Sequence, residues 1–105
     1  MDLHQILARA RTRSRLPIAD KAGVLATIAQ LIGTDVANLD TTALTAGLTA
    51  RERLGSTGLG EGIAIPHCRL KSTQTLTGAL ITLAEPIEFD ALDDEPVDIV
   101  FALIA

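Results

Sequence analysis

Apolar side chains recur at helical spacing through the first half of the chain. A short stripe comes first, formed by Leu3, Ile6, Leu7 and Ala10. A stronger stripe follows Asp20 and consists of Val24, Leu25, Ile28, Leu31 and Ile32. Asp20 is a suitable N-cap for this helix, and Gly33 a suitable end. The pattern predicts another helix from Asp40 to about Arg53, with Gly55 as its stop.

The spacing of the apolar residues is no longer helical after Gly55. Three apolar segments of strand length follow, at Ile63–Ile65, Leu76–Leu83 and Val97–Ile104. Pro86 and Pro96 separate them, and the residues 90–95 predict an acidic loop. Helices followed by strands predict an α/β fold with a mixed β-sheet flanked by helices. The length of 105 residues predicts a single domain spanning 1–105.

Composition and charge narrow the choice of partners. Hydrophobic residues make up 48% of the chain, with two Phe and no Trp or Tyr, so the core is aliphatic. The formal net charge of −4 disfavours nucleic acid, whose phosphates require a basic surface. Arginines alternate from Arg9 to Arg15, which favours an extended segment with one basic, solvated face. The longest apolar run, 99–105, is far shorter than the roughly 20 residues of a membrane span, so we expect no membrane insertion.

A glycine-rich segment, 55–62, leads into the short apolar run that ends at Pro66 and His67. Glycines allow backbone N–H groups to come close to an anion. Pro66 has no N–H to donate, so it interrupts the strand and fixes His67 at its edge. This arrangement suits a histidine whose imidazole nitrogen attacks phosphorus.

Each of these features also has a structural interpretation. Glycine segments are mostly flexible turns, and a lone histidine is more often a surface or core residue than a nucleophile. The segment does not match a P-loop, because Glu61 stands where lysine is required, or a dinucleotide fingerprint, because Ile63 replaces the third glycine. A metal site is not expected, because His67 and Cys68 would point to opposite faces of a strand. We expect Cys68 to be a small buried hydrophobe.

Arg51 lies on the predicted second helix, just before the glycine segment. A guanidinium there can hold a phosphoryl group bidentately. The alternative is an exposed charge run, Arg51-Glu52-Arg53, at a helix end where cations suit the helix dipole. From the residues alone, this alternative is the stronger one.

The run from Arg51 to His67, RERLGSTGLGEGIAIPH, closely resembles the signature of the IIA components of the bacterial phosphotransferase system, fructose/mannitol type. Two further stretches, 12–15 and 89–98, resemble the nitrogen-regulatory branch of that family. The resemblance covers nearly all of the chain, and its core from Gly55 to His67 is highly specific.

The resemblance implies that His67 is phosphorylated by a phosphohistidine carrier protein of the HPr class. It implies that Arg51 supports the active site and that Ser56, Thr57 and Gly58 contact the phosphate. The implied fold is a mixed α/β sandwich, and the implied location is the bacterial cytoplasm. No cofactor or metal is implied. Members of the nitrogen branch chiefly regulate protein partners according to their own phosphorylation state.

Two features depart from the family pattern. Cys68 stands where the family usually has glycine, and a side chain there is expected to crowd a docking partner or stiffen the turn. Family members also continue beyond the position of Ala105 into further strand and helix that carry a second active-site histidine. We therefore expect a domain that is incomplete at its C-terminal end, with an exposed apolar sheet face and self-association through it.

The implied reaction is an in-line phosphoryl transfer to His67. Neutral imidazole is the nucleophile, so we expect the reaction to weaken below about pH 6.5, the reference value for histidine. A regulatory binding module, with phosphorylation as a charge switch, is the favoured function. The alternatives are a sugar-transport IIA that passes phosphate to a IIB domain, and an inactive structural fragment.

Overall fold

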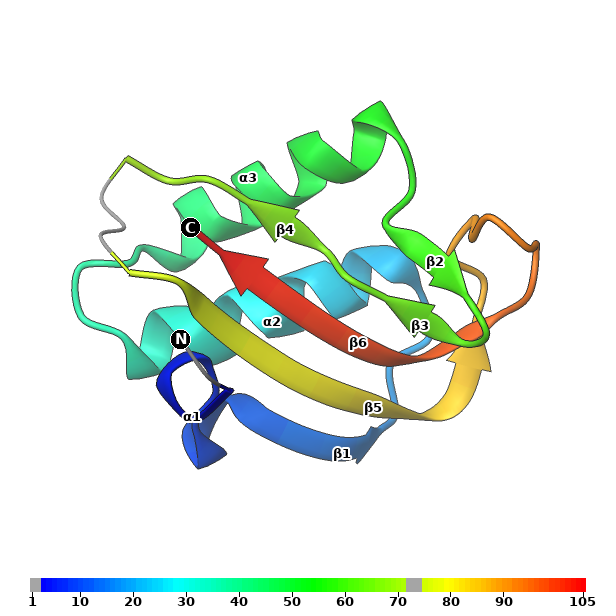
Figure 1. Ribbon diagram of the computed structural model, residues 1–105, viewed down its shortest axis with the longest axis horizontal. Helices are drawn as coiled ribbons and strands as arrows, with labels where there is room; N and C mark the ends of the chain where they lie inside the picture. The colour runs from blue at the N-terminus through cyan, green and yellow to red at the C-terminus, as the bar shows by residue number, and fades with distance from the viewer. Residues whose placement is uncertain (1–2, 72–74) are drawn as a thin grey trace.

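The computed structural model describes residues 3–71 and 75–105 (Figure 1). The helical elements are α1 (Leu3–Ile6), the 3-10 turn η1 (Arg9–Arg11), α2 (Lys21–Asp35) and α3 (Thr41–Leu54). The strands are β1 (Thr12–Leu16), β2 (Gly58–Gly60), β3 (Ile63–Ala64), β4 (His67–Cys68), β5 (Thr77–Ile87) and β6 (Val97–Ile104). The two long helices pack along one face of the sheet (Figure 1).

The strands form one mixed sheet in the order β1-β5-β6-β3-β2, with β4 pairing to β6 beyond the end of β3. The β5–β6 and β2–β3 pairs are antiparallel. The β1–β5, β3–β6 and β4–β6 pairs are parallel. This arrangement confirms the predicted α/β fold with a mixed sheet flanked by helices.

Both predicted helix caps are present. The side chain of Asp20 accepts a hydrogen bond from the Gly23 N–H at 2.8 Å, and that of Asp40 accepts one from the Ala43 N–H at 2.9 Å. These bonds satisfy donors that a helix start leaves without partners. Gly55 ends α3 as predicted.

Gly33 does not end α2, and that prediction was wrong. The helix continues to Asp35. A Cβ built on Gly33 would lie 2.2 Å from the Thr41 Oγ1, so the glycine lets the start of α3 approach α2 closely. The missing side chain therefore serves packing between helices rather than termination.

The strands differ in part from those that the sequence pattern predicts. β6 has the predicted bounds, but β5 runs through Pro86 to Ile87, so Pro86 does not end it as predicted. A register shift between Thr82 and Ile87 accommodates the proline in the pairing with β6. The sheet also contains β2 and β4, which the sequence analysis did not predict as strands.

One of the alternating arginines is not part of a solvated basic face. Arg11 is buried, lies in η1, and pairs with Asp35 at the end of α2. Its Nε donates to the Gly78 carbonyl, and its Nη2 donates to the Ile6 carbonyl, both at 2.9 Å. The guanidinium therefore joins α1, α2 and β5, which corrects the expectation for this position.

The core lies between the sheet and the helices α2 and α3. Alternate residues of β6 are fully buried there, namely Val100, Ala102 and Ile104. They meet helix side chains that are also fully buried, including Ile28, Ile32, Leu44 and Leu48. Acidic residues 93–95 stay exposed in the predicted loop before β6.

The opposite side of the sheet, here called the open face, is apolar and only partly covered. Successive side chains of a strand alternate between faces, so Ile99, Phe101 and Leu103 of β6 point to this side. Ile99 is 40% exposed, and Phe101 and Leu103 are half-buried. Among the described residues, Ile6 of α1 reaches this face, because a Cβ on Gly78 would lie 2.7 Å from its Cγ2. In the described ranges, no helix is long and apolar enough to cross a membrane.

Candidate functional site

His67 opens β4 and lies on the open face. It is the register partner of Leu103 in a parallel pair, and laterally paired residues share a face of the sheet. The imidazole is exposed. Its Nδ1 lies 2.9 Å from the Ile65 carbonyl oxygen. A carbonyl oxygen can only accept, so Nδ1 carries the proton in the neutral ring and Nε2 is the nitrogen with the free lone pair.

The segment before His67 is anchored on two sides. The Ile65 N–H donates to the Thr57 carbonyl at 3.0 Å, which ties this segment to the glycine-rich residues. The Pro66 carbonyl accepts from the Leu103 N–H at 2.9 Å, which ties it to β6. Pro66 itself is fully buried. The backbone that presents the imidazole is therefore fixed even though the ring is in solvent.

Cys68 points to the face opposite His67, as predicted. A Cβ built on Gly47 of α3 would lie 3.1 Å from the Cys68 Sγ, so the thiol packs against that helix. Burial raises the pKa of the Cys68 thiol above its ordinary value. The interpretation as a small hydrophobe is confirmed, but Cys68 is only partly buried against the core rather than fully buried. The Cys68 side chain lies on the other side of the sheet from His67, and its effect on a docking partner or on the turn stays a prediction.

Ser56, Thr57 and Gly58 are bonded to their own surroundings. The Ser56 hydroxyl donates to the Phe89 carbonyl at 2.7 Å and accepts from the Gly58 N–H at 3.0 Å. Thr57 is buried, and its hydroxyl donates to Glu52 Oε2 at 2.6 Å. A Cβ on Gly58 would lie 2.8 Å from that of Ala91, so only glycine fits there. Phosphate contact by these three residues stays a prediction; in this arrangement the two hydroxyls hold the loop together.

Arg51 lies in the last turn of α3 and is half-buried. Its Nη1 donates to the Gly55 carbonyl at 2.8 Å. The Arg51 side chain is thereby bonded to the glycine-rich segment. Residue 57 of that segment anchors the chain just before His67. Hydrogen bonds and the backbone of residues 55–58 together connect the five predicted site residues, from Arg51, which bonds to Gly55, to His67, which bonds to Ile65. The catalytic role of Arg51 stays a prediction.

Glu52 was missed by the sequence analysis, which placed it in an exposed charge run. It is buried, and its carboxylate accepts from Thr57 and contacts the Lys21 ammonium at 3.1 Å. The spacing held a signal for this, since Glu52 follows Leu44 and Leu48 at intervals of four on the buried side of α3. No local pattern predicted the role of Lys21, because its partners are distant in sequence.

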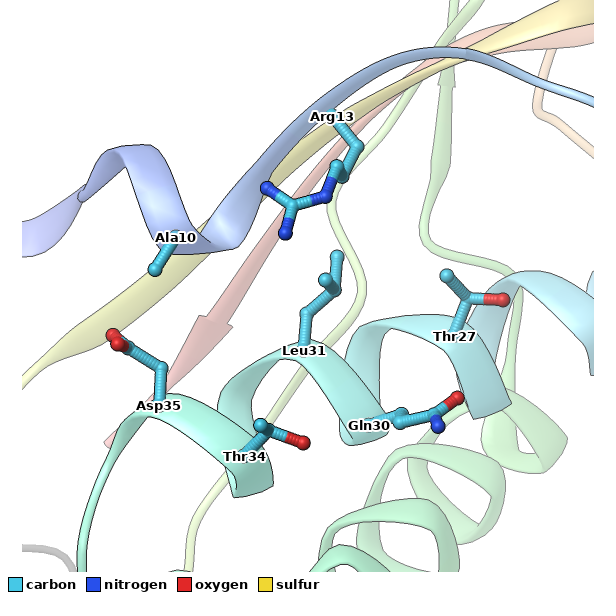
Figure 2. Close-up of a pocket in the computed structure, with 7 residues that line it drawn as sticks. All are labelled: Ala10, Arg13, Thr27, Gln30, Leu31, Thr34 and Asp35. Carbon is cyan, nitrogen blue, oxygen red and sulfur yellow. The ribbon is translucent and has the colours of Figure 1, made fainter.

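A pocket of about 320 Å³ lies elsewhere, between the β1 edge of the sheet and α2 (Figure 2). Arg13, Leu31 and Asp35 are among the residues that line it. Two strands, β5 and β6, separate β1 from β4, so this pocket does not belong to the His67 neighbourhood. Within residues 3–71 and 75–105, no group of three His, Cys, Asp or Glu side chains could hold a metal ion.

The chain is similar to known proteins over nearly its whole length. Residues 5–105 match the family described as "Phosphoenolpyruvate-dependent sugar phosphotransferase system, EIIA 2". A "Nitrogen regulatory protein" of Pseudomonas aeruginosa is 45% identical over 102 residues, which are 97% of this chain and 66% of that protein. One of Escherichia coli is 41% identical over 105 residues, 99% of this chain and 64% of that protein. This chain thus spans about two thirds of the length of these curated relatives.

Solved structures show the same fold. The crystal structure of "Nitrogen Regulatory Protein IIA-Ntr" from Neisseria meningitidis superposes with a TM-score of 0.92 at 35% identity, covering 97% of this chain and 69% of that one. A complex of enzyme IIAMTL and phosphorylated enzyme IIBMTL from Escherichia coli matches with a TM-score of 0.75 at 18% identity, covering 94% and 69%. The resemblance found in the residues 51–67 is confirmed, and the chain belongs to the EIIA 2 family of the phosphoenolpyruvate-dependent sugar phosphotransferase system.

Proposed function

We propose that this chain is a phosphoryl-accepting regulatory IIA protein, phosphorylated on His67 by a phosphohistidine carrier of the HPr class. One observation carries the proposal: an exposed imidazole whose Nδ1 is bonded to a fixed backbone carbonyl. That bond makes Nε2 the nucleophile before any partner arrives. Preorganisation of this kind removes an orientational cost from the transfer step.

The proposed step is a displacement at phosphorus. The lone pair of His67 Nε2 forms a bond to phosphorus while the phosphorus–nitrogen bond of the donor phosphohistidine breaks. The donor imidazole leaves with that electron pair, and the proton on His67 Nδ1 stays in place. The phosphorylated ring gains positive charge, which strengthens the hydrogen bond from Nδ1 to the Ile65 carbonyl. No separate proton acceptor is needed.

Arg51 is proposed to stabilise the transferred group. The bond to the Gly55 carbonyl uses one of the five N–H groups of the guanidinium. The others are suited to equatorial phosphoryl oxygens, whose charge is greatest during transfer. Ser56, Thr57 and Gly58 are proposed to shape the loop beside the phosphate.

A regulatory output is favoured over sugar transport. The relatives reported above are named nitrogen regulatory proteins. Phosphorylation adds close to two negative charges beside the apolar Leu103, which changes the surface that a partner meets. The second candidate is transfer to a IIB domain, favoured by the fold shared with the IIA chain of the mannitol complex. The proposal places the chain in the bacterial cytoplasm with its donor, as one IIA domain over 1–105 that can self-associate through its open face.

The test is phosphate uptake from a charged HPr-type carrier. We expect His67→Ala to abolish acid-labile, base-stable labelling, whereas His4→Ala, the matched control, keeps it. Undiminished labelling of His67→Ala would refute the assignment. Two experiments separate the two outputs. In one, the phosphorylated protein is mixed with a IIB domain. In the other, the partners captured in a pull-down are compared between the phosphorylated and the unphosphorylated protein. Transfer to IIB without a change in captured partners would favour sugar transport.

A further inference from the structure

A buried carboxylate lies next to the site without contacting the imidazole. The Glu52 side chain is 5% exposed, and both of its oxygens have partners. Oε1 accepts from the Thr57 N–H at 3.0 Å, and Oε2 accepts from the Thr57 hydroxyl at 2.6 Å. Burial of a charge is costly unless such partners are present. Here two of the bonds go to one residue of the glycine-rich loop.

Lys21 completes the environment of this carboxylate. Its Nζ lies 3.1 Å from Glu52 Oε1 and 3.2 Å from Asp90 Oδ2. The same ammonium lies 4.7 Å from the centre of the fully buried Phe89 ring. The Phe89 carbonyl in turn accepts from the Ser56 hydroxyl. The first residue of α2 thereby holds Glu52 against the loop and holds the segment 89–90 on its other side.

A continuous series of hydrogen bonds runs from Glu52 to the imidazole. Thr57 donates its N–H to Glu52 and accepts at its carbonyl from the Ile65 N–H at 3.0 Å. Ile65 accepts at its own carbonyl from His67 Nδ1 at 2.9 Å. The carbonyl that selects the tautomer of His67 is therefore positioned by Thr57, and Thr57 is positioned by Glu52.

We propose that Glu52, held by Lys21, is a positioning residue that keeps Thr57 and the Ile65 carbonyl in place and so keeps Nε2 of His67 ready for attack. This inference rests on the proposed function. A purely stabilising role fits less well, because replacing a buried ion pair with apolar residues is often neutral or favourable for stability. A leucine would also continue the buried stripe of α3 after Leu44 and Leu48.

The difference between a stabilising role and a positioning role of Glu52 can be tested by substitution. Glu52→Leu keeps the buried stripe but removes every acceptor for Thr57, whereas Glu52→Gln keeps one amide oxygen for the Thr57 N–H. The same two substitutions at the exposed Glu85 of β5 are the matched controls. Circular dichroism and the unfolding midpoint check the fold of each variant. If Glu52→Leu does not fold, Glu52→Gln alone carries the comparison with its control.

Two measurements then decide whether Glu52 positions His67. Imidazole ¹⁵N NMR reports the fraction of neutral His67 that is protonated on Nδ1, and steady-state transfer from a charged HPr-type carrier reports kcat and KM. We expect Glu52→Leu to raise the Nε2-protonated tautomer and to lower kcat about tenfold or more, with KM little changed. Glu52→Gln should recover part of both effects, and the Glu85 variants should match wild type.

An unchanged tautomer in folded Glu52 variants, whatever the rate, would overturn the positioning role. If the wild-type chain accepts no phosphate, the proposed function fails. The NMR comparison would then still decide whether Glu52 sets the tautomer, so the two failures are distinguishable.

Discussion

Adjacent residues of β4 have opposite chemistry because a strand alternates its faces. His67 is exposed on the open face with Nδ1 bonded to Ile65, whereas Cys68 packs against α3. The nucleophile of the proposed reaction is therefore the imidazole, and the neighbouring thiol belongs to the packing between the sheet and the helices. Chemistry at this position depends on which face each residue occupies.

Alkylation of Cys68 tests that assignment. Burial limits access to the thiol and raises its pKa, so less thiolate is present at any pH below the raised value than in a free cysteine. We expect iodoacetamide to react severalfold more slowly with the native protein at pH 8 than with glutathione, and the rate to keep rising at higher pH. The protein in guanidinium is the control. A native rate equal to that of the control would contradict the packing described.

Substitution of Arg51 tests the charge proposed at the site. Arg51→Ala removes the bond to Gly55, which contributes about 1 kcal/mol to stability, so the fold should persist. We expect a large loss of phosphoryl-transfer rate, and Arg51→Lys should recover only part of it because an ammonium cannot bind bidentately. Initial rates at saturating carrier provide the measurement. Rates equal to wild type would remove Arg51 from the catalytic set.

At the scale of elements, small residues decide how closely the parts approach. Gly33 allows α3 to start against α2, and Gly58 allows β2 to lie against Ala91. Gly33 lies where the end of α2 meets the start of α3, and Gly58 follows Thr57, whose carbonyl anchors the segment before His67. Close packing at these two positions thus requires glycine.

Gly33→Ala is the corresponding prediction. Alanine in a helix interior normally stabilises by up to about 1 kcal/mol relative to glycine. Here the added Cβ would lie 2.2 Å from the Thr41 Oγ1, so we expect a net loss of about 1–3 kcal/mol. Urea unfolding of the variant against wild type measures the sign. An increase in stability would show that the two helices are not packed as described.

At the scale of the whole molecule, the open face combines apolar surface with the exposed His67. Ile99 and Leu103 lie on the side to which His67 points, and the described helices α2 and α3 cover the other side. An exposed apolar patch favours association with another surface. Under the proposed function, a partner that docks at His67 would meet both features together.

Self-association through this face is expected when no partner is present. Sedimentation velocity should show a larger species whose share grows with protein concentration. Ile99→Lys should reduce that share because it places a charge in the patch, whereas Leu92→Lys, in the exposed acidic loop, should leave it unchanged. A monomer at all concentrations, or equal effects of the two variants, would contradict the expectation.

Local patterns predicted the features that depend on near neighbours. The caps Asp20 and Asp40 bond three residues ahead, and the alternation in β6 depends on its own residues. Features set by distant pairing were missed. β2 and β4 are too short to show a period, and Arg11 is buried because of carbonyls and a carboxylate far along the chain. Glu52 needs Lys21 and Thr57 to be buried, and only the folded chain brings these together.

The most direct measurement is the location of the phosphate itself. After incubation with a charged HPr-type carrier, ³¹P–¹⁵N correlation NMR of the ¹⁵N-histidine-labelled protein identifies both the residue and the nitrogen that carries the group. We expect a single coupling, to Nε2 of His67, with Nδ1 still protonated. Phosphate on Nδ1, on His4, or on no histidine would contradict this expectation.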